Sequence, residues 1–111
     1  MIEASIRRNT AGHIYAFTLM NHAEESNVCA AVSFLAQNTA NCIKSIAEEQ
    51  VTYGHDPKGG FLQIELPRVK EGHVNPSANV LLDAFAFGLR SVKDKHRNEI
   101  DIKDDFHDRN D

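Results

Sequence analysis

Apolar and polar residues alternate over most of the first twenty positions, as they do in a pair of β-strands. One face of residues 2–8 is apolar and the other polar, which predicts a half-buried strand. Residues 14–20 alternate again, but both of their faces are fairly apolar, which is typical of a central strand. Residues 9–13 contain asparagine and glycine and predict a turn. The two strands should therefore form a hairpin.

The apolar period changes after this hairpin. Over residues 28–50 it becomes helical, with one stripe made of Val28, Val32, Leu35, Thr39, Ile43 and Ile46. We expect Ser26 or Asn27 to cap the start of this helix, because their side-chain oxygens can accept a bond from an unpaired backbone N–H.

The second half of the chain predicts four further elements. They are a short strand at 51–53, a strand at 61–66 that ends at Pro67, a helix at 77–95 and a strand at 99–103, with a turn at 54–60. Asn75 is a good N-cap for the last helix, and Pro76 suits its first turn. The charged residues 104–111 are expected to fray as a tail.

The order β-β-α-β-β-α-β predicts an α+β fold, in which one mixed or antiparallel sheet packs against two helices. A single domain over residues 1–111 fits the length of the chain. Residues 77–95 are apolar over more than one helical face, so the first helix or a second copy of the chain should cover the remainder. Gly88 interrupts this helix, and close helix packing is the expected reason.

Composition narrows the classes of partner. The formal net charge of −4 argues against a nucleic-acid-binding surface spread over the domain. No apolar run approaches the roughly 18 residues of a membrane span, and the N-terminus does not resemble a signal peptide, so we expect a cytoplasmic protein with free thiols. Close metal-ligand spacings are missing from the sequence, and no metal or other cofactor is expected.

One segment combines two groups that cysteine chemistry needs. His22 stands in a short polar loop, and Cys29 follows at the start of the predicted helix, where we expect it at the second or third helical position. Unpaired N–H groups there stabilise a thiolate and can hold an oxyanion. Ser33 lies four residues on, on the same helical face as Cys29, and can lend a hydroxyl. Glu24 and Glu25 act in the opposite direction, because negative charge disfavours a thiolate.

Other readings of these residues are structural. Most free cysteines are small buried apolar residues, which is also the expectation for Cys42 in the middle of the helix. Cys29 and Cys42 are 13 positions apart, about 20 Å along a straight helix, so they cannot form a disulfide. Of the remaining histidines, His55 in the Gly/Pro-rich turn is the one that could line a site.

The pair His22-Ala23 and the segment Val-Cys-Ala-Ala-Val-Ser at 28–33 resemble the signature of the ribosomal-processing cysteine protease family, Prp. The resemblance implies a small cytosolic homodimer of α+β fold. It also implies removal of a short N-terminal extension from a large-subunit ribosomal protein. The family's catalytic histidine and cysteine match His22 and Cys29, and its serine after the cysteine matches Ser33.

Three features depart from the usual family pattern. Asn21 stands where the family usually has glycine, and only six residues separate His22 from Cys29 where many members have a longer loop with glycine. Ser26 lies near the place of an aspartate.

The leading hypothesis is therefore a cysteine endopeptidase with Cys29 as the nucleophile and His22 as the base. Ala30 and Ser33 are auxiliary candidates. The candidate substrate loop consists of Asn21, Ala23, Glu24, Glu25, Ser26 and Asn27. The expected partners are an extended ribosomal protein and a second copy of the chain, with no direct nucleic-acid or membrane partner. The alternative is a non-catalytic, ribosome-associated binding module of the same fold.

Overall fold

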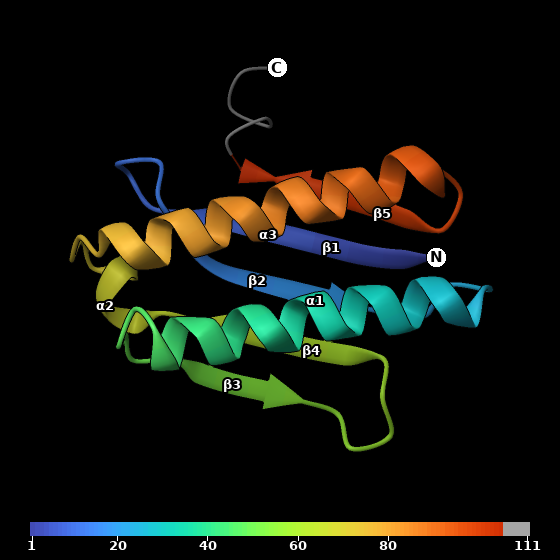
Figure 1. Cartoon of the computed structure of the whole chain (residues 1–111), viewed down its shortest axis with the longest axis horizontal. Coiled ribbons are helices and arrows are strands. Elements are labelled where there is room, and N and C mark those ends of the chain that lie inside the picture. The colour runs from blue at the N-terminus through green and yellow to red at the C-terminus, as the bar shows by residue number, and fades with distance from the viewer. Residues whose placement is uncertain (106–111) are drawn as a thin grey trace.

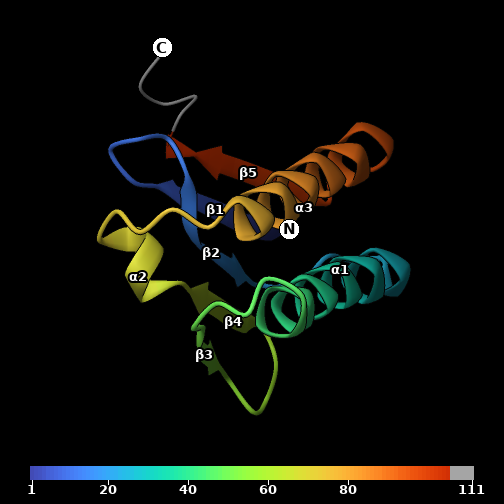
Figure 2. The same cartoon turned by 60° about the vertical axis from the view of Figure 1, so that its left-hand side comes forward.

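Two long helices lie side by side on one face of a five-stranded sheet in the computed structural model, which describes residues 1–105 (Figures 1 and 2). The elements are β1 (Ile2–Arg8), β2 (Ile14–Met20), α1 (Ser26–Ser45), β3 (Thr52–His55), β4 (Phe61–Glu65), α2 (Pro67–Lys70), α3 (Pro76–Lys95) and β5 (Ile100–Asp104). The predicted α+β class and element order are confirmed, with one additional single-turn helix, α2.

The sheet is mixed, with strand order β3-β4-β2-β1-β5. β1 and β2 form the predicted antiparallel hairpin, and β2 is central, between β1 and β4. β5 pairs with β1 in parallel, so the last strand returns to the first. This pairing brings the turn that precedes β5 next to the N-terminal end of β1.

The core lies between the sheet and the paired helices. Its largest buried side chains include Ile6, Phe17 and Ile64 from the strands, Val28, Val32 and Ile43 from α1, and Leu82, Phe85 and Leu89 from α3. The rings of Phe17 and Phe85 stack with their centroids 4.0 Å apart. The alternation in the first strands and the helical stripes therefore identified the buried faces.

The first helix is shorter than its apolar stripe predicted. α1 ends at Ser45 rather than residue 50, and Ile46 is 66 % exposed. The backbone turns at Glu48, whose φ is +51°, and the buried carboxylate of Glu49 then accepts a bond of 3.0 Å from Asn75 Nδ2. This hydrogen bond joins the turn after α1 to the residue that caps α3. The tertiary contact outweighs the local helical pattern.

The predictions for the start of the second long helix are confirmed. Asn75 caps α3 by accepting a 3.1 Å bond from the N–H of Ala78, and Pro76 is the first helical residue. β3 begins and ends later than predicted and includes His55, which was assigned to the turn. Asp104 belongs to β5 rather than to the predicted tail, of which residues 106–111 lie outside the described part of the chain.

A buried ion pair anchors β5. Asp104 is 2 % exposed at its side chain, and its carboxylate accepts from Arg8 Nε at 2.8 Å and from Arg90 at 3.0 Å. The hydrogen bond that Arg8 donates to Asp104 raises the pKa of Arg8 above its ordinary value, against the opposing effect of burial. The last strand is therefore connected to both β1 and α3 by charge as well as by backbone pairing.

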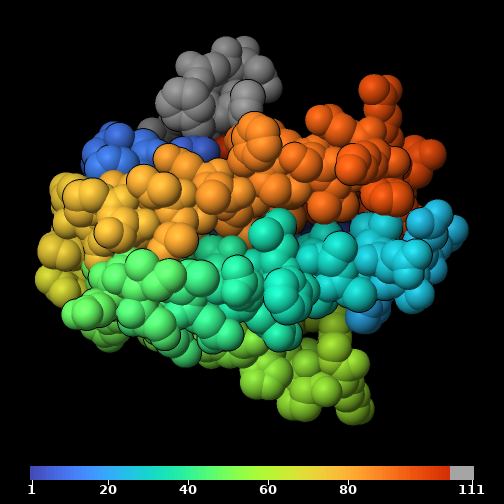
Figure 3. Space-filling view, in the orientation of Figure 1, coloured from blue at the N-terminus to red at the C-terminus, as the bar shows by residue number. Residues whose placement is uncertain are grey.

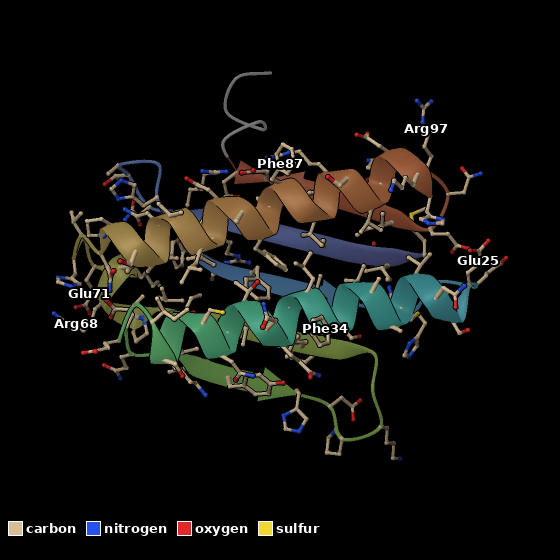
Figure 4. All side chains as sticks on the ribbon, viewed as in Figure 1. Glu25, Phe34, Arg68, Glu71, Phe87 and Arg97 are labelled. Atoms are coloured by element: carbon tan, nitrogen blue, oxygen red, sulfur yellow. The ribbon has the colours of Figure 1, made fainter. Side chains whose placement is uncertain are left out.

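α1 covers part of the apolar surface of α3. This was one of the two expected covers for that helix, the other being a second copy of the chain. A Cβ added at Gly88 would lie 2.8 Å from Cδ2 of Leu35, so the missing side chain permits the close helix contact. Phe34 and Phe87 remain 74 % and 71 % exposed on the outer helix faces, and Figure 4 labels both. Across residues 1–105, none of the helices is both long and apolar enough to cross a membrane.

Candidate active site

A groove of about 200 Å³ lies between the first half of α1 and the β3–β4 hairpin. Figure 3 shows the loop of this hairpin projecting beyond the helices, on the side of α1. The residues that line the groove come from β1, β2, α1, β3 and β4 and from the loops that join them: Ile2, Leu19, Asn21, His22, Cys29, Val32, Ser33, Gln37, Tyr53, His55, Asp56, Gly59, Gly60, Phe61 and Leu62. The groove thus brings His22 and Cys29 to one surface.

Cys29 lies slightly deeper in α1 than predicted. Glu25 is the N-cap and makes no side-chain capping bond, so the expectation that Ser26 or Asn27 caps the helix is wrong. Cys29 is therefore the fourth helical residue rather than the second or third. The N–H groups of Val28 and Cys29 both donate to the Glu25 carbonyl, at 3.1 and 3.4 Å, so they are already paired.

The backbone of Ala23 surrounds the Cys29 sulfur on two sides. The N–H of Ala23 donates to Sγ at 3.1 Å, and the thiol can donate to the Ala23 carbonyl at 3.5 Å. Ala23 itself is buried, which holds this peptide unit in place. An N–H directed at sulfur stabilises the thiolate form by a charge-assisted hydrogen bond. The sulfur therefore has a specific hydrogen-bond donor that the helix periodicity did not predict.

His22 follows a left-handed residue and rests on a glycine turn. Asn21 has φ of +67°, and its N–H donates to the Gly60 carbonyl at 2.8 Å. A Cβ added at Gly60 would lie 3.1 Å from Nε2 of His22, and one at Gly59 would lie 3.6 Å from Cε1. Within residues 1–105 the His22 ring has no side-chain hydrogen-bond partner, so packing on this glycine pair sets its position.

The other predicted site residues are distributed over several surfaces. Ser33 lines the groove, as does Asn21 from the candidate substrate loop. Ala23 is buried behind Cys29, while Glu24, Glu25, Ser26 and Ala30 are exposed and do not line the groove. Asn27 lines a separate hollow between α1 and α3. Most of the 21–27 loop therefore flanks the groove rather than forming its walls.

Several groove residues were not identified from sequence. Gln37 lies four residues after Ser33 and eight after Cys29, so the helical period could have placed it on the same face. Tyr53 and Asp56 come from the edge strand β3 and the loop that follows it, whereas His55 of the same strand lines the groove as the sequence suggested. No local sequence signal connects that hairpin to α1, because their proximity depends on the order of strands in the sheet. No group of three His, Cys, Asp or Glu side chains suited to a metal ion occurs in residues 1–105.

The family model for cysteine protease Prp matches residues 1–101. The chain belongs to the Prp cysteine protease family. Curated protein sequences contain no match to it.

Solved structures share the Prp fold. SMU.848 from Streptococcus mutans is 27 % identical, with a TM-score of 0.80 over 94 % of this chain and 93 % of that one. An essential ribosomal processing protease Prp from Staphylococcus aureus is similar in two complexes. The complex with a covalently linked product peptide is 23 % identical with a TM-score of 0.83, and the complex with a substrate peptide is 20 % identical with a TM-score of 0.82. Each covers 94 % of this chain and 99 % of the other, which shows a common fold over nearly the full length.

Proposed function

We propose that this Prp family member is a cysteine endopeptidase in which Cys29 is the nucleophile and His22 is the general base. The observation that supports the assignment is that both residues line one groove, with the Ala23 N–H directed at the Cys29 sulfur. A solvent-open groove beside a sulfur with its own donor is what a thiolate nucleophile requires.

The proposed reaction proceeds in two steps. The Cys29 proton passes to the His22 imidazole, and the thiolate attacks the scissile carbonyl carbon to form a tetrahedral intermediate. The C–N bond then breaks, and the imidazolium gives its proton to the leaving amine. Water, deprotonated by His22, attacks the resulting thioester, which releases the new carboxyl terminus and restores the thiol.

The proposed substrate is the N-terminal extension of a large-subunit ribosomal protein. The Staphylococcus aureus relative is a ribosomal processing protease with peptide complexes of the same fold, which supports the proposal. An extended peptide suits the groove, because apolar side chains of Leu19, Phe61 and Leu62 line it together with polar groups of Ser33 and Gln37.

The test is to incubate the protein with the extended ribosomal precursor and to identify the products by mass spectrometry, beside Cys29→Ala and His22→Ala variants. We expect one N-terminal cut that disappears in Cys29→Ala and slows by at least about a hundredfold in His22→Ala. Cys42→Ala is the matched control and should cut normally. Binding without cutting in the unmodified protein would contradict the proposal and favour the binding module.

We also propose that the protein acts as a cytoplasmic homodimer. The exposed Phe34 and Phe87 on the outer faces of α1 and α3 support an apolar contact with a second copy. Sedimentation should give twice the chain mass, and Phe87→Asp should shift the equilibrium toward the monomer. A monomeric unmodified protein would contradict this part of the proposal.

A further inference from the structure

The short loop between His22 and Cys29 is held by a carboxylate from the other end of the chain. Glu99 Oε2 accepts from the N–H of Glu24 at 2.9 Å, and Oε1 accepts from the N–H of Glu25 at 3.3 Å. Figure 4 shows Glu25 and Arg97, near the two ends of this contact, at the same end of the molecule. One side chain thus binds two consecutive backbone donors, an arrangement in which a carboxylate is a strong acceptor.

The backbone at Glu99 is itself fixed on both sides. Its N–H donates to the His96 carbonyl at 3.0 Å, and its carbonyl accepts from the Ile2 N–H at 2.8 Å. The first bond belongs to the turn that ends α3, and the second starts the pairing of β5 with β1. Glu99 therefore projects its carboxylate from a fixed position in the turn before β5 toward the loop that contains Ala23.

Three consecutive N–H groups of the loop have defined acceptors. Ala23 donates to the Cys29 sulfur, while Glu24 and Glu25 donate to Glu99. Since the Ala23 peptide joins directly to the Glu24 nitrogen, holding the Glu24 N–H also fixes the plane that carries the Ala23 carbonyl. The carboxylate consequently restrains the two peptide units on either side of Glu24, and the first of these carries the Ala23 carbonyl and limits how Ala23 can turn beside the sulfur.

We infer that Glu99 is a positioning residue for Cys29: by holding the loop at Glu24 and Glu25 it keeps Ala23 in the place from which its N–H reaches the sulfur. The inference deepens the proposed function, on which it rests for its role in catalysis. Glu99 supplies hydrogen bonds that a short loop cannot make within itself, because only five residues join β2 to α1.

Removal of Glu99 can change the alkylation rate of Cys29 in two opposite directions, and the direction observed tests the inference. A negative charge near a thiol disfavours the thiolate, so loss of charge alone would speed alkylation of Cys29 and move its pH profile to lower pH. Loss of positioning would do the reverse, because the sulfur would lose its donor. A merely structural role far from the sulfur would leave the profile unchanged.

The experiment measures the iodoacetamide reaction of Cys29 against pH in the full chain, with Cys29 and Cys42 separated by peptide mass spectrometry. In Glu99→Ala we expect the rate at pH 7 to fall by about threefold to tenfold and the midpoint of the profile to rise by about half a pH unit. Glu99→Gln, which keeps one acceptor oxygen, should lie between, about twofold slower than the unmodified protein.

Glu71→Ala is the charge-matched control, because Glu71 is exposed at the opposite end of the molecule (Figure 4), and it should leave the profile unchanged. Equal or faster alkylation in Glu99→Ala would overturn the inference. If Glu99→Ala unfolds, seen as a matching rise in Cys42 alkylation, Glu99→Gln decides, and a rate equal to or above the unmodified one overturns the inference.

The readout needs no substrate, so the two proposals fail separately. A changed Cys29 profile in a protein that does not cleave the ribosomal precursor would retain the positioning role and overturn the proposed function. Normal cleavage by the unmodified protein, with an unchanged Cys29 profile in both Glu99 variants, would support the proposed function and overturn the positioning role.

Discussion

The His22 ring packs directly on Gly60, where a Cβ would lie 3.1 Å from Nε2. Gly60 has φ of +86°, in the left-handed region that side chains disfavour, and Gly59 has the same φ. This glycine pair thus serves as the surface on which the proposed general base rests. In the absence of a side-chain partner within residues 1–105, the shape of the glycine turn takes over the orienting role that a third residue has in other cysteine and serine hydrolases.

Gly60→Ala should therefore lower the rate of precursor cleavage by about tenfold, because His22 must move by a few tenths of an ångström. Gly12→Ala is the matched control, since Gly12 has φ of +88° and nothing within 4 Å of an added Cβ. Both variants should lose about 1 kcal/mol of unfolding free energy from backbone strain, measured by urea denaturation. Equal cleavage rates in the two variants would contradict the role of Gly60.

Asn21 explains one departure from the usual family pattern. Its φ of +67° is a conformation that glycine adopts freely and asparagine tolerates better than other residues, and its side chain donates to the Glu3 carboxylate. Asn21→Gly should stay within about 0.5 kcal/mol of the unmodified stability and retain cleavage, because relief of φ offsets the lost exposed bond. Asn21→Ala should lose about 1 kcal/mol. If urea denaturation finds Asn21→Ala as stable as Asn21→Gly, the backbone conformation is not the cause.

The effect of a substitution at Gly88 on the free energy of unfolding should depend on the side chain at Leu35. Alanine at 88 gains about 1 kcal/mol of helix propensity, but its Cβ meets Leu35 Cδ2 at 2.8 Å and forces that side chain to shift. We expect Gly88→Ala to be close to neutral alone and stabilising by about 1 kcal/mol in a Leu35→Ala background. A double-mutant cycle measured by denaturation gives the coupling. Equal effects in both backgrounds would show that the helices do not meet at this point.

The Arg8–Asp104 pair should contribute strongly to stability. Asp104→Asn leaves the cations of Arg8 and Arg90 facing a neutral amide, so we expect a loss of about 3 kcal/mol, whereas Asp101→Asn should lose at most about 0.5 kcal/mol. Asp101 also pairs with a cation, Lys93, but their side chains are 46 % and 41 % exposed against 2 % for Asp104.

The same pair gives a pH prediction. Because the folded-state pKa of Arg8 is raised, its contribution is complete below the unfolded value and declines only as pH rises through the folded value. The stability difference between Asp104→Asn and the unmodified protein should therefore stay constant from pH 7 to 9. A decline within that range would contradict the assignment of the effect to the Arg8 guanidinium.

The sequence by itself determined the element order and the core faces, because alternation and helical period act over a few neighbouring residues. Ile6, Phe17 and Leu82 are buried as those periods predicted, and Asn75 caps its helix through a contact three residues away. The position of His22 and Cys29 on one groove was also predictable, since only six residues separate them along the chain. The end of α1 could not be predicted, because the contact of buried Glu49 with Asn75 joins positions 26 residues apart.

Only the tertiary structure decided how the proposed site is built. The sheet order places the β3–β4 hairpin, with Tyr53 and His55, beside α1, and the parallel return of β5 carries Glu99 to the loop 75 residues before it. The Gly59–Gly60 turn reaches His22 by the same strand pairing. These contacts depend on how strands are ordered in a sheet, and a local hydrophobic pattern specifies which face of a strand is buried but not which strand lies next to it.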